Sequence, residues 1–282
     1  MASLMRTWLA ALLLLPLGAA GAAGVRIVSQ TVGTDEALLA VADPGQIAAL
    51  SPLAHNPEYS AVAREAKPYP ELVVNGDAES VLKFRPSVVL CADYSRVELV
   101  SQLRTAGVRV IVFNHYATLQ DSYEMLRRIA AEVGAPERAE AVIAECERRT
   151  AALRERLKGI KPVRVISPST YDIIPGDHTT FQDLCDHAGA ENLAATLGQL
   201  HGNVASPDEQ MLAWPIDEVV VSGTDRAAAL APYRKLPPYE FMAAVRDGRA
   251  ALMEPWMLGC VSFRRVDAYF ALARALHPEA WR

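Results

Sequence analysis

The feature that most constrains this chain is one long amphipathic helix, which the sequence predicts over residues 136–158. Pro136 suits the first helical position, and Gly159 follows the last basic residues and ends the helix. At about 1.5 Å per residue the helix is roughly 35 Å long, enough to reach from one small domain to a second. Its face toward the protein is formed by residues at steps of three and four, namely Ala139, Val142, Ile143, Cys146, Thr150, Leu153 and Leu157.

Short apolar runs alternate with helical patterns on both sides of this helix. Several of these runs are continuous in Val, Ile and Leu, which is typical of parallel strands covered on both faces. The alternation pauses for two successive helices, 119–133 and 136–158. We therefore predict an α/β fold of two Rossmann-like lobes with mostly parallel sheets, joined by one long α-helix. The predicted strands are 25–31, 47–51, 87–92, 108–113, 163–167, 218–222 and 251–254.

A short internal sequence repeat supports the two-lobed plan. Glu79 and Leu82 precede a Val-rich run at 88–90, and Glu209 and Leu212 precede a second one 130 positions later (209 against 79). The domain boundaries that we expect are 1–22 for a signal peptide, 23–117 for an N-terminal lobe, 118–160 for a helical linker, and 161–282 for a C-terminal lobe.

The first 22 residues have the composition of a signal peptide. Arg6 supplies a positive start, the apolar run 9–17 is too short to span a bilayer, and small residues at 20–22 form a cleavage site. An uncleaved membrane anchor is the alternative. No cysteine follows the cleavage site until Cys91, so we expect no lipid anchor. The signal peptide predicts that the protein is exported, to the periplasm if the source is a double-membraned bacterium.

The four cysteines are widely spaced and fit no CxxC or zinc pattern. Cys91 lies in a predicted strand and Cys146 on the apolar face of the long helix, so both are expected in the core. Cys185 and Cys260 could form a disulfide in an oxidising compartment. The sequence leaves all three pairings of four cysteines open.

The sequence argues against nucleic-acid binding, nucleotide-binding and hydrolase motifs, and a dedicated metal site. The formal charge of −5 comes with no basic stripe, which argues against nucleic acid as a partner. Neither GxGxxG, GxxxxGK[ST] nor GxSxG is present. The histidines at 55, 115, 178, 187, 201 and 277 never form HxH or HExxH, which argues against a dedicated metal site. We therefore predict no catalytic residues, no metal site and no cofactor.

Aromatic and polar residues gather after the predicted strands, where open parallel sheets bind their ligands. Such a mixture suits a broad, partly apolar ligand held between two surfaces, with rings against its faces. For each residue, packing on its own lobe is the alternative. The predicted ligand-binding residues are Tyr59, Tyr94, Arg96, Tyr116, Tyr171 and Trp256.

The whole pattern resembles the periplasmic binding proteins that deliver ferric siderophores, haem or vitamin B12 to ABC importers, whose lobes are joined by a single backbone helix. The matching stretches are 25–29, 34–36, 79–82, 85–89, 176–181, 188–192, 206–210 and 276–278. The resemblance implies a monomeric binding protein, not an enzyme, for a small-molecule metal chelate. A ferric siderophore comes first, with cobalamin and haem as alternatives. For haem, Tyr94, His115, Tyr116 or Tyr171 are candidate axial ligands.

The resemblance also implies a partner, the permease dimer of an ABC importer at the inner membrane. In this family an exposed Glu on each lobe docks into arginine pockets of the permease, and the matching positions are Glu79 and Glu209. Glu209 has a second interpretation, because Ser206 to Glu209 also forms a capping box. Residues 259–265 depart from the Gly-Pro-Arg turn of many members. An exported enzyme using Asp93, His115 and Asp172 is the alternative class.

Overall fold

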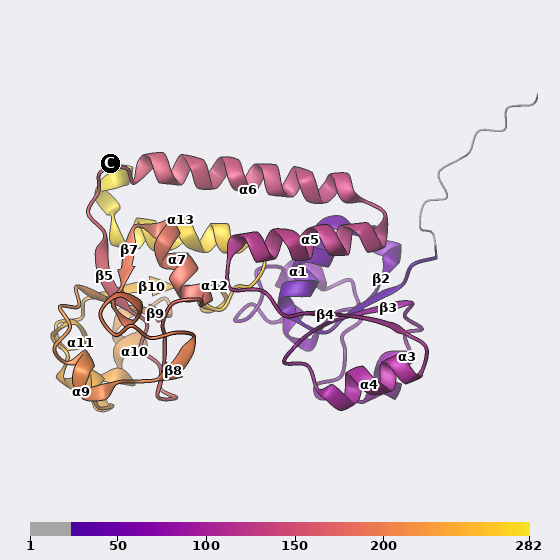
Figure 1. Cartoon of the computed structure of the whole chain (residues 1–282), viewed down its shortest axis with the longest axis horizontal. Helices are drawn as coiled ribbons and strands as arrows, with labels where there is room; N and C mark the ends of the chain where they lie inside the picture. Colours follow the sequence, from indigo (N-terminus) through magenta and orange to yellow (C-terminus); the bar gives the residue numbers. More distant parts are fainter. Residues whose placement is uncertain (1–23) are drawn as a thin grey trace, which may run out of the picture.

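The computed structural model describes residues 24–282, so the predicted signal peptide lies outside the described residues. Two α/β lobes lie side by side, and the long helix α6 (Pro136–Arg156) runs over both of them along the top of Figure 1. Helix α6 buries Ala139, Ile143, Cys146, Thr150 and Leu153, and Val142 and Leu157 are half-buried. The predicted helix and its buried face are therefore confirmed, although the helix ends two residues before Lys158.

The N-terminal lobe is built on a parallel sheet in the order β2-β1-β3-β4. Val88 of β3 pairs with Ile27 on one side and Arg109 on the other, and β3 is buried throughout because both of its faces are covered. The strands are β1 (Ile27–Ser29), β2 (Ile47–Ala49), β3 (Val88–Ala92) and β4 (Arg109–Phe113), and the helices are α1 (Val32–Val41), α2 (Ala63–Ala66), α3 (Ala78–Leu82) and α4 (Val97–Thr105).

The C-terminal lobe repeats this plan with a parallel sheet in the order β10-β9-β5-β7, beside a two-stranded antiparallel pair of β6 and β8. The strands are β5 (Val163–Ile166), β6 (Ile173–Pro175), β7 (Ala190–Asn192), β8 (Asn203–Ala205), β9 (Glu218–Ser222) and β10 (Ala250–Met253). The helices are α7 (Thr180–Ala188), α8 (Leu193–Thr196), α9 (Asp208–Met211), α10 (Arg226–Leu230), α11 (Ala243–Arg246), α12 (Pro255–Leu258) and α13 (Arg265–Leu276).

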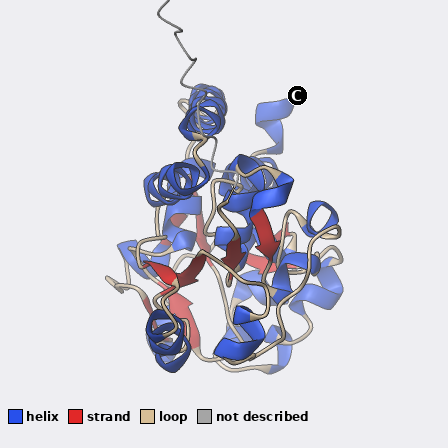
Figure 2. Cartoon of the chain, turned by 90° about the vertical axis from the view of Figure 1, so that its right-hand side faces the viewer, coloured by secondary structure: helices blue, strands red, loops and turns tan. Residues whose placement is uncertain are grey.

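The predicted fold class is confirmed, and the internal sequence repeat has a structural counterpart. Glu79 lies on α3 before the inner strand β3, and Glu209 lies on α9 before the inner strand β9. Strands β6, β7 and β8 were not predicted, because each has only three residues and no run of Val or Ile longer than two. The turned view of Figure 2 shows strands inside and helices outside.

The two lobes are joined by more than α6. Helix α5 (Leu119–Val133) packs against α1 and α6, and α6 also contacts α7 and α13 of the other lobe. One continuous hydrophobic cluster runs from Ile27 and Leu90 through Ile143 to Leu184 and Leu272. Within residues 24–282, no helix is both long and apolar enough to cross a membrane.

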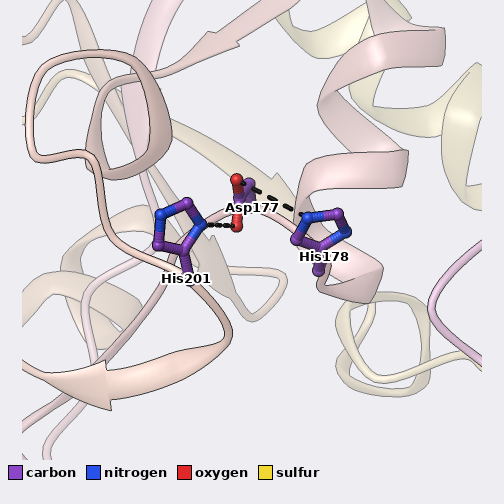
Figure 3. A group of neighbouring side chains, drawn as sticks. All are labelled: Asp177, His178 and His201. Atoms are coloured by element: carbon purple, nitrogen blue, oxygen red, sulfur yellow. Dashed lines mark hydrogen bonds and ion pairs between the residues drawn. The ribbon is translucent and has the colours of Figure 1, made fainter.

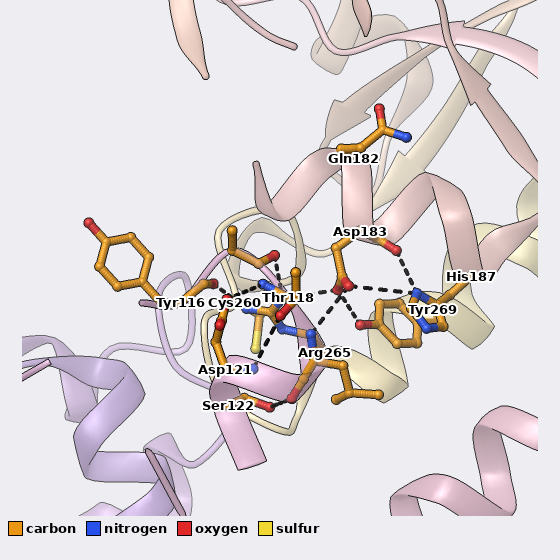
Figure 4. Close-up of polar contacts among 12 residues, drawn as sticks. Tyr116, Thr118, Asp121, Ser122, Gln182, Asp183, His187, Cys260, Arg265 and Tyr269 are labelled. Atoms are coloured by element: carbon orange, nitrogen blue, oxygen red, sulfur yellow. Dashed lines mark hydrogen bonds and ion pairs between the residues drawn. The ribbon is translucent and has the colours of Figure 1, made fainter. Parts of the chain in front are cut away.

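A buried polar network, centred on Asp183, reinforces the junction (Figure 4). The Arg265 guanidinium donates to Asp183 Oδ2 at 2.9 Å, and to the carbonyls of Ala117 at 2.8 Å and Tyr116 at 2.7 Å. The Leu119 N–H donates to the other Asp183 oxygen at 3.2 Å. Because Asp183 and Arg265 belong to C-terminal helices and residues 116–119 follow β4, this Asp183 network ties the two lobes together.

Candidate functional site

A cavity of about 700 Å³ lies where loops of both lobes meet. The N-terminal lobe contributes the segments that follow β1, β2 and β3, and the C-terminal lobe contributes Ser222 at the end of β9 and the segment after β10. These are the carboxyl ends of parallel strands, where peptide groups and loop side chains face outward. The volume falls within the range of about 300 to 1,000 Å³ that is usual for small-molecule sites.

Four of the six predicted ligand-binding residues line this cavity, namely Tyr59, Tyr94, Arg96 and Trp256. Three come from the N-terminal lobe, and Trp256 lies on α12 of the other lobe. The indole N–H of Trp256 donates to Glu254 at 2.9 Å, which fixes the orientation of the ring. The structure thus brings together aromatic side chains that are almost 200 positions apart.

Tyr94 follows β3 and is 62% exposed. Partial burial raises the pKa of its hydroxyl, and the nearby carboxylates of Asp93 and Asp35 raise it further. Tyr94 is therefore a protonated phenol at neutral pH. Tyr116 does not line the cavity but packs edge-to-face on Tyr94, with ring centroids 5.9 Å apart, and its hydroxyl donates to Asp93 at 3.1 Å. Tyr116 supports a cavity residue from behind.

Arg96 immediately precedes α4, and its guanidinium donates to the carbonyl of Gly76. This bond holds the segment 72–76 against the start of α4. Among residues 24–282 the Arg96 side chain has no other hydrogen-bond partner, so further N–H groups are available to a bound anion or carbonyl.

Tyr59 is 53% exposed and lies in a turn in which its N–H donates to the Asn56 carbonyl at 3.0 Å. Tyr171 lies elsewhere. It is 84% exposed, and it does not line the cavity. The loop after β5 that carries Tyr171 continues into β6, and this predicted strand-end residue is not among those that line the cavity with Trp256.

The sequence interpretation missed the apolar pair Val73 and Val74, which line the cavity and are both exposed. Their segment lies beside β2, because the Leu72 N–H donates to the Leu50 carbonyl at 2.9 Å. A sequence feature that could have indicated these two valines is the apolar run 72–74 directly before an Asn-Gly turn. This run is too short for a buried strand, so its side chains are free to face a ligand.

Glu36 also lines the cavity and is 2% exposed. It accepts a hydrogen bond from the Ala61 N–H at 3.0 Å and one from the Ser262 hydroxyl of the C-terminal lobe. Burial raises the pKa of Glu36. Because Glu36 lies on α1 and Ser262 follows α12, this contact joins the lobes beneath the cavity.

The cavity lining carries few charges. Its ionisable carboxylates and cations are Glu36, Glu58 and Arg96, with a single positive charge among them. A ligand with several negative charges would therefore meet little compensation, whereas a broad apolar ligand would find aromatic rings and valines.

The four cysteines are all buried and free, so Cys185 and Cys260 are not joined. Cys185 packs in the shared core, while Cys260 lies by the cavity with its Sγ 3.9 Å from Glu36. Burial raises the pKa of the Cys91 and Cys146 thiols to about 11 and that of Cys260 to about 12. Thiols with such pKa values are poor nucleophiles at neutral pH.

Glu79 and Glu209 are both exposed and lie on the short helices α3 and α9. Figure 1 shows these helices at the lower side of the two lobes, opposite α6. The capping interpretation of Glu209 is wrong. The Ser206 N–H donates to the Asp172 carbonyl at 3.3 Å, and no side chain caps α9. The Glu209 carboxylate is not held by its own helix.

The sequence and the fold were compared with those of known proteins. A family model described as "Periplasmic binding protein" matches residues 27–255, which is most of the chain. Among curated proteins, none matches the sequence at a significant level.

Solved structures share the fold at low sequence identity. The haem-binding protein RhuT from Roseiflexus sp. RS-1 superposes with a TM-score of 0.77 at 22% identity, over 91% of this chain and 99% of that one. A periplasmic haem-binding protein from Pseudomonas aeruginosa gives 0.76 at 24%, over 90% and 92%. The vitamin B12-binding protein BtuF of Vibrio cholerae gives 0.70 at 17%, over 91% and 98%.

Proposed function

The chain belongs to the periplasmic binding protein family, and from this premise we propose that it captures haem in the cavity between its lobes and delivers it to an ABC importer. The family consists of binding proteins, so the chain is a solute-binding protein of the metal-chelate group and not an enzyme. The sequence alone put a ferric siderophore first. Haem takes that place here because similar structures include the two haem-binding proteins above.

The observation that carries the proposal is the composition of the cavity. Tyr59, Tyr94 and Trp256 offer ring faces, and Val73 and Val74 add an apolar surface. A flat macrocycle is stabilised by such contacts over both of its faces. A triply charged ferric catecholate needs several cations, and among residues 24–282 this lining offers one, Arg96.

The iron of haem also requires an axial donor. No histidine lines the cavity within residues 24–282, whereas two tyrosines do, and tyrosine is a known haem ligand. Of the residues considered from the sequence, this leaves Tyr94, and the structure adds Tyr59. Arg96 would pair with a propionate, because a guanidinium is the natural partner of a carboxylate.

The test is a titration of the mature protein with haemin, followed by the shift of the Soret band. Wild type should bind one haemin, and the double variant Tyr59→Phe/Tyr94→Phe should lose the spectrum of tyrosine-ligated iron. Tyr171→Phe is the matched control, since Tyr171 is an exposed tyrosine outside the cavity. An unchanged spectrum in the double variant rules out both tyrosines as ligands.

Cobalamin is the second candidate, because a weakly charged cavity also suits a corrin ring that carries amide groups in place of carboxylates. Tryptophan quenching by cyanocobalamin, haemin, and ferric hydroxamate and catecholate chelates separates the candidates. Tight binding of a ferric chelate with no haemin binding would return the assignment to the siderophores.

The proposed partner is the permease dimer of an ABC importer, on the periplasmic side of the inner membrane. Glu79 and Glu209 are our proposed docking residues. Their support is that each is exposed on a short helix, one in each lobe, and that these helices lie at the same side of the molecule (Figure 1). Two carboxylates on a rigid body give register through charge-assisted bonds to arginine.

A further inference from the structure

Three metal-ligating side chains converge on the C-terminal lobe, outside the cavity (Figure 3). His201 Nδ1 lies 2.7 Å from Asp177 Oδ1, and His178 Nε2 lies 3.9 Å from Asp177 Oδ2. All three ligand atoms lie within 4.8 Å of one another. Both imidazole rings are exposed, and their centroids are 6.4 Å apart.

The backbone brings these residues together across 24 positions. Asp177 follows β6 and His201 precedes β8, and next to the antiparallel pairing of these strands the two residues form an isolated parallel bridge. The Asp177 N–H donates to the Leu200 carbonyl at 2.9 Å, and the Gly202 N–H donates to the Asp177 carbonyl at 2.9 Å. The hydrogen bonds that fix Asp177 beside His201 are therefore made by the backbone and do not depend on the side chains.

His178 is placed by an unusual backbone conformation. Its φ of +54° lies in the left-handed region, which few residues other than glycine adopt. The next residue, Thr179, caps α7 by accepting a hydrogen bond from the Gln182 N–H at 3.1 Å and donates to the Gly176 carbonyl at 2.8 Å. These bonds fix the chain on both sides of His178, so its backbone position next to Asp177 is set while its ring remains free to rotate.

From this geometry we propose that Asp177, His178 and His201 bind one divalent transition-metal ion, with Zn²⁺ as the reference ion. Two imidazoles and a carboxylate are a common zinc ligand set. A tetrahedral ion at about 2.0 to 2.2 Å from each ligand atom holds those atoms about 3.4 Å apart. Rotations of two exposed histidine side chains are enough to reach that spacing from the distances above.

A plain surface ion pair does not explain the arrangement as well. Such a pair needs one histidine and contributes at most about 1 kcal/mol. Here two imidazoles face the two oxygens of one carboxylate, so three groups that can bind a metal converge where an ion pair would use only two. The fourth position is open to solvent because both rings are exposed, so water completes the coordination. The imidazole ligands predict that Cu²⁺ and Zn²⁺ bind and that Mg²⁺ does not.

The test is calorimetric titration of the full mature chain with ZnCl₂, using protein without a histidine tag. We expect one Zn²⁺ per chain. His201→Ala and His178→Ala should each weaken binding by more than the roughly 10- to 100-fold that the loss of an outer-sphere partner costs. His115→Ala is the matched control, because His115 is an exposed histidine of the other lobe, and it should bind like wild type.

Co²⁺ supplies a second measurement that a non-specific surface effect would not reproduce. A tetrahedral Co²⁺ complex absorbs visible light strongly, and the band should appear in wild type and vanish in Asp177→Asn. Thermal midpoints without metal should be the same for all variants, since the exposed rings contribute little to packing. Zn²⁺ affinity that is equal in wild type and His178→Ala/His201→Ala, or no one-to-one binding at all, overturns the proposal. Neither result bears on haem binding.

Discussion

Asp35 and Glu36 are adjacent on α1, and both carboxyls are buried in the protein. The Ser51 N–H and hydroxyl both donate to Asp35, with the N–H at 3.1 Å. These bonds favour the charged form, but burial outweighs them and, with the charge of Glu36, raises the pKa of Asp35 to about 7. Folding at mildly acidic pH therefore takes up a proton at this residue.

The sign of the effect on stability follows from linkage. The folded pKa lies above the unfolded one, so stability from the protonated form is fully present below the unfolded pKa near 3.8 and is lost as pH rises through about 7. Asp35→Asn removes this titration. Relative to the variant, we expect wild type to lose up to about 4 kcal/mol of unfolding free energy from about pH 4 to about pH 8.

Urea unfolding of both proteins at several pH values measures this difference. Glu254→Gln provides a control, because Glu254 is an exposed carboxylate whose removal should leave the slope unchanged. Parallel pH profiles for wild type and Asp35→Asn would show that folding does not raise the pKa of Asp35.

Trp256 is the main aromatic contribution of the C-terminal lobe to the cavity. Its ring is fixed by the bond to Glu254, so little side-chain entropy is lost on binding. We expect Trp256→Ala to weaken ligand binding by roughly 1 to 3 kcal/mol, in the range of a buried aromatic anchor. Calorimetry with the identified ligand tests this, and an unchanged dissociation constant in a folded variant would remove Trp256 from the site.

Among the secondary-structure elements, α3 and α9 stand out because each is a single turn of helix that presents an exposed Glu. Asp77 caps α3 by accepting a hydrogen bond from the Ser80 N–H at 2.9 Å, so Glu79 is not needed for the cap. Helix α9 has no side-chain cap at all. Neither carboxylate therefore forms a side-chain cap of its helix.

We predict that Glu79→Gln and Glu209→Gln impair delivery and leave capture intact. Neither residue lines the cavity, so ligand affinity and thermal midpoint should stay near the wild-type values. Binding to the cognate permease should weaken by roughly 2 to 5 kcal/mol for each carboxylate that is desolvated in the complex. Transport and permease-binding assays on both single variants and the double variant measure this.

Glu98→Gln is a suitable control for that experiment, since Glu98 is an exposed Glu in the first turn of a helix in the same lobe as Glu79. It should transport normally. Full transport by the Glu79→Gln/Glu209→Gln double variant would show that the two carboxylates do not dock.

For the whole molecule, three features couple the lobes: the continuous helix α6, the hydrophobic cluster that extends through both lobes, and the Asp183 network. Opening the lobes would expose buried apolar area and break the hydrogen bonds that join Asp183 and Arg265 to residues 116–119, both at a cost in free energy. A continuous helix also bends less readily than flexible strand connections.

We therefore expect ligand binding to change the radius of gyration by less than about 1 Å, as in other complexes of preorganised proteins. Small-angle scattering of the mature chain with and without ligand measures it. The Tyr59→Phe/Tyr94→Phe variant, mixed with the same ligand, controls for scattering by unbound ligand. A decrease of several ångström in wild type alone would contradict a rigid junction.

The sequence by itself determined the elements and their order. The spacing of Ala139, Ile143 and Leu153 gives one apolar face to a helix of over five turns, and such a face must be buried along its length. Runs such as 88–92 are typical of parallel strands covered on both sides. Because these signals are local and periodic, the two-lobed fold class and the strand ends that carry the cavity could be predicted from them.

Only the tertiary structure decided which strand-end residues meet. Tyr94 and Tyr171 follow equivalent-looking strands, yet one lines the cavity and the other does not, because the loop after β5 turns into β6. His178 and His201 appear unrelated in the sequence, and the pairing of β6 with β8 brings them to one carboxylate. Such contacts depend on loop paths and strand pairing between distant residues, which no local pattern of side chains encodes.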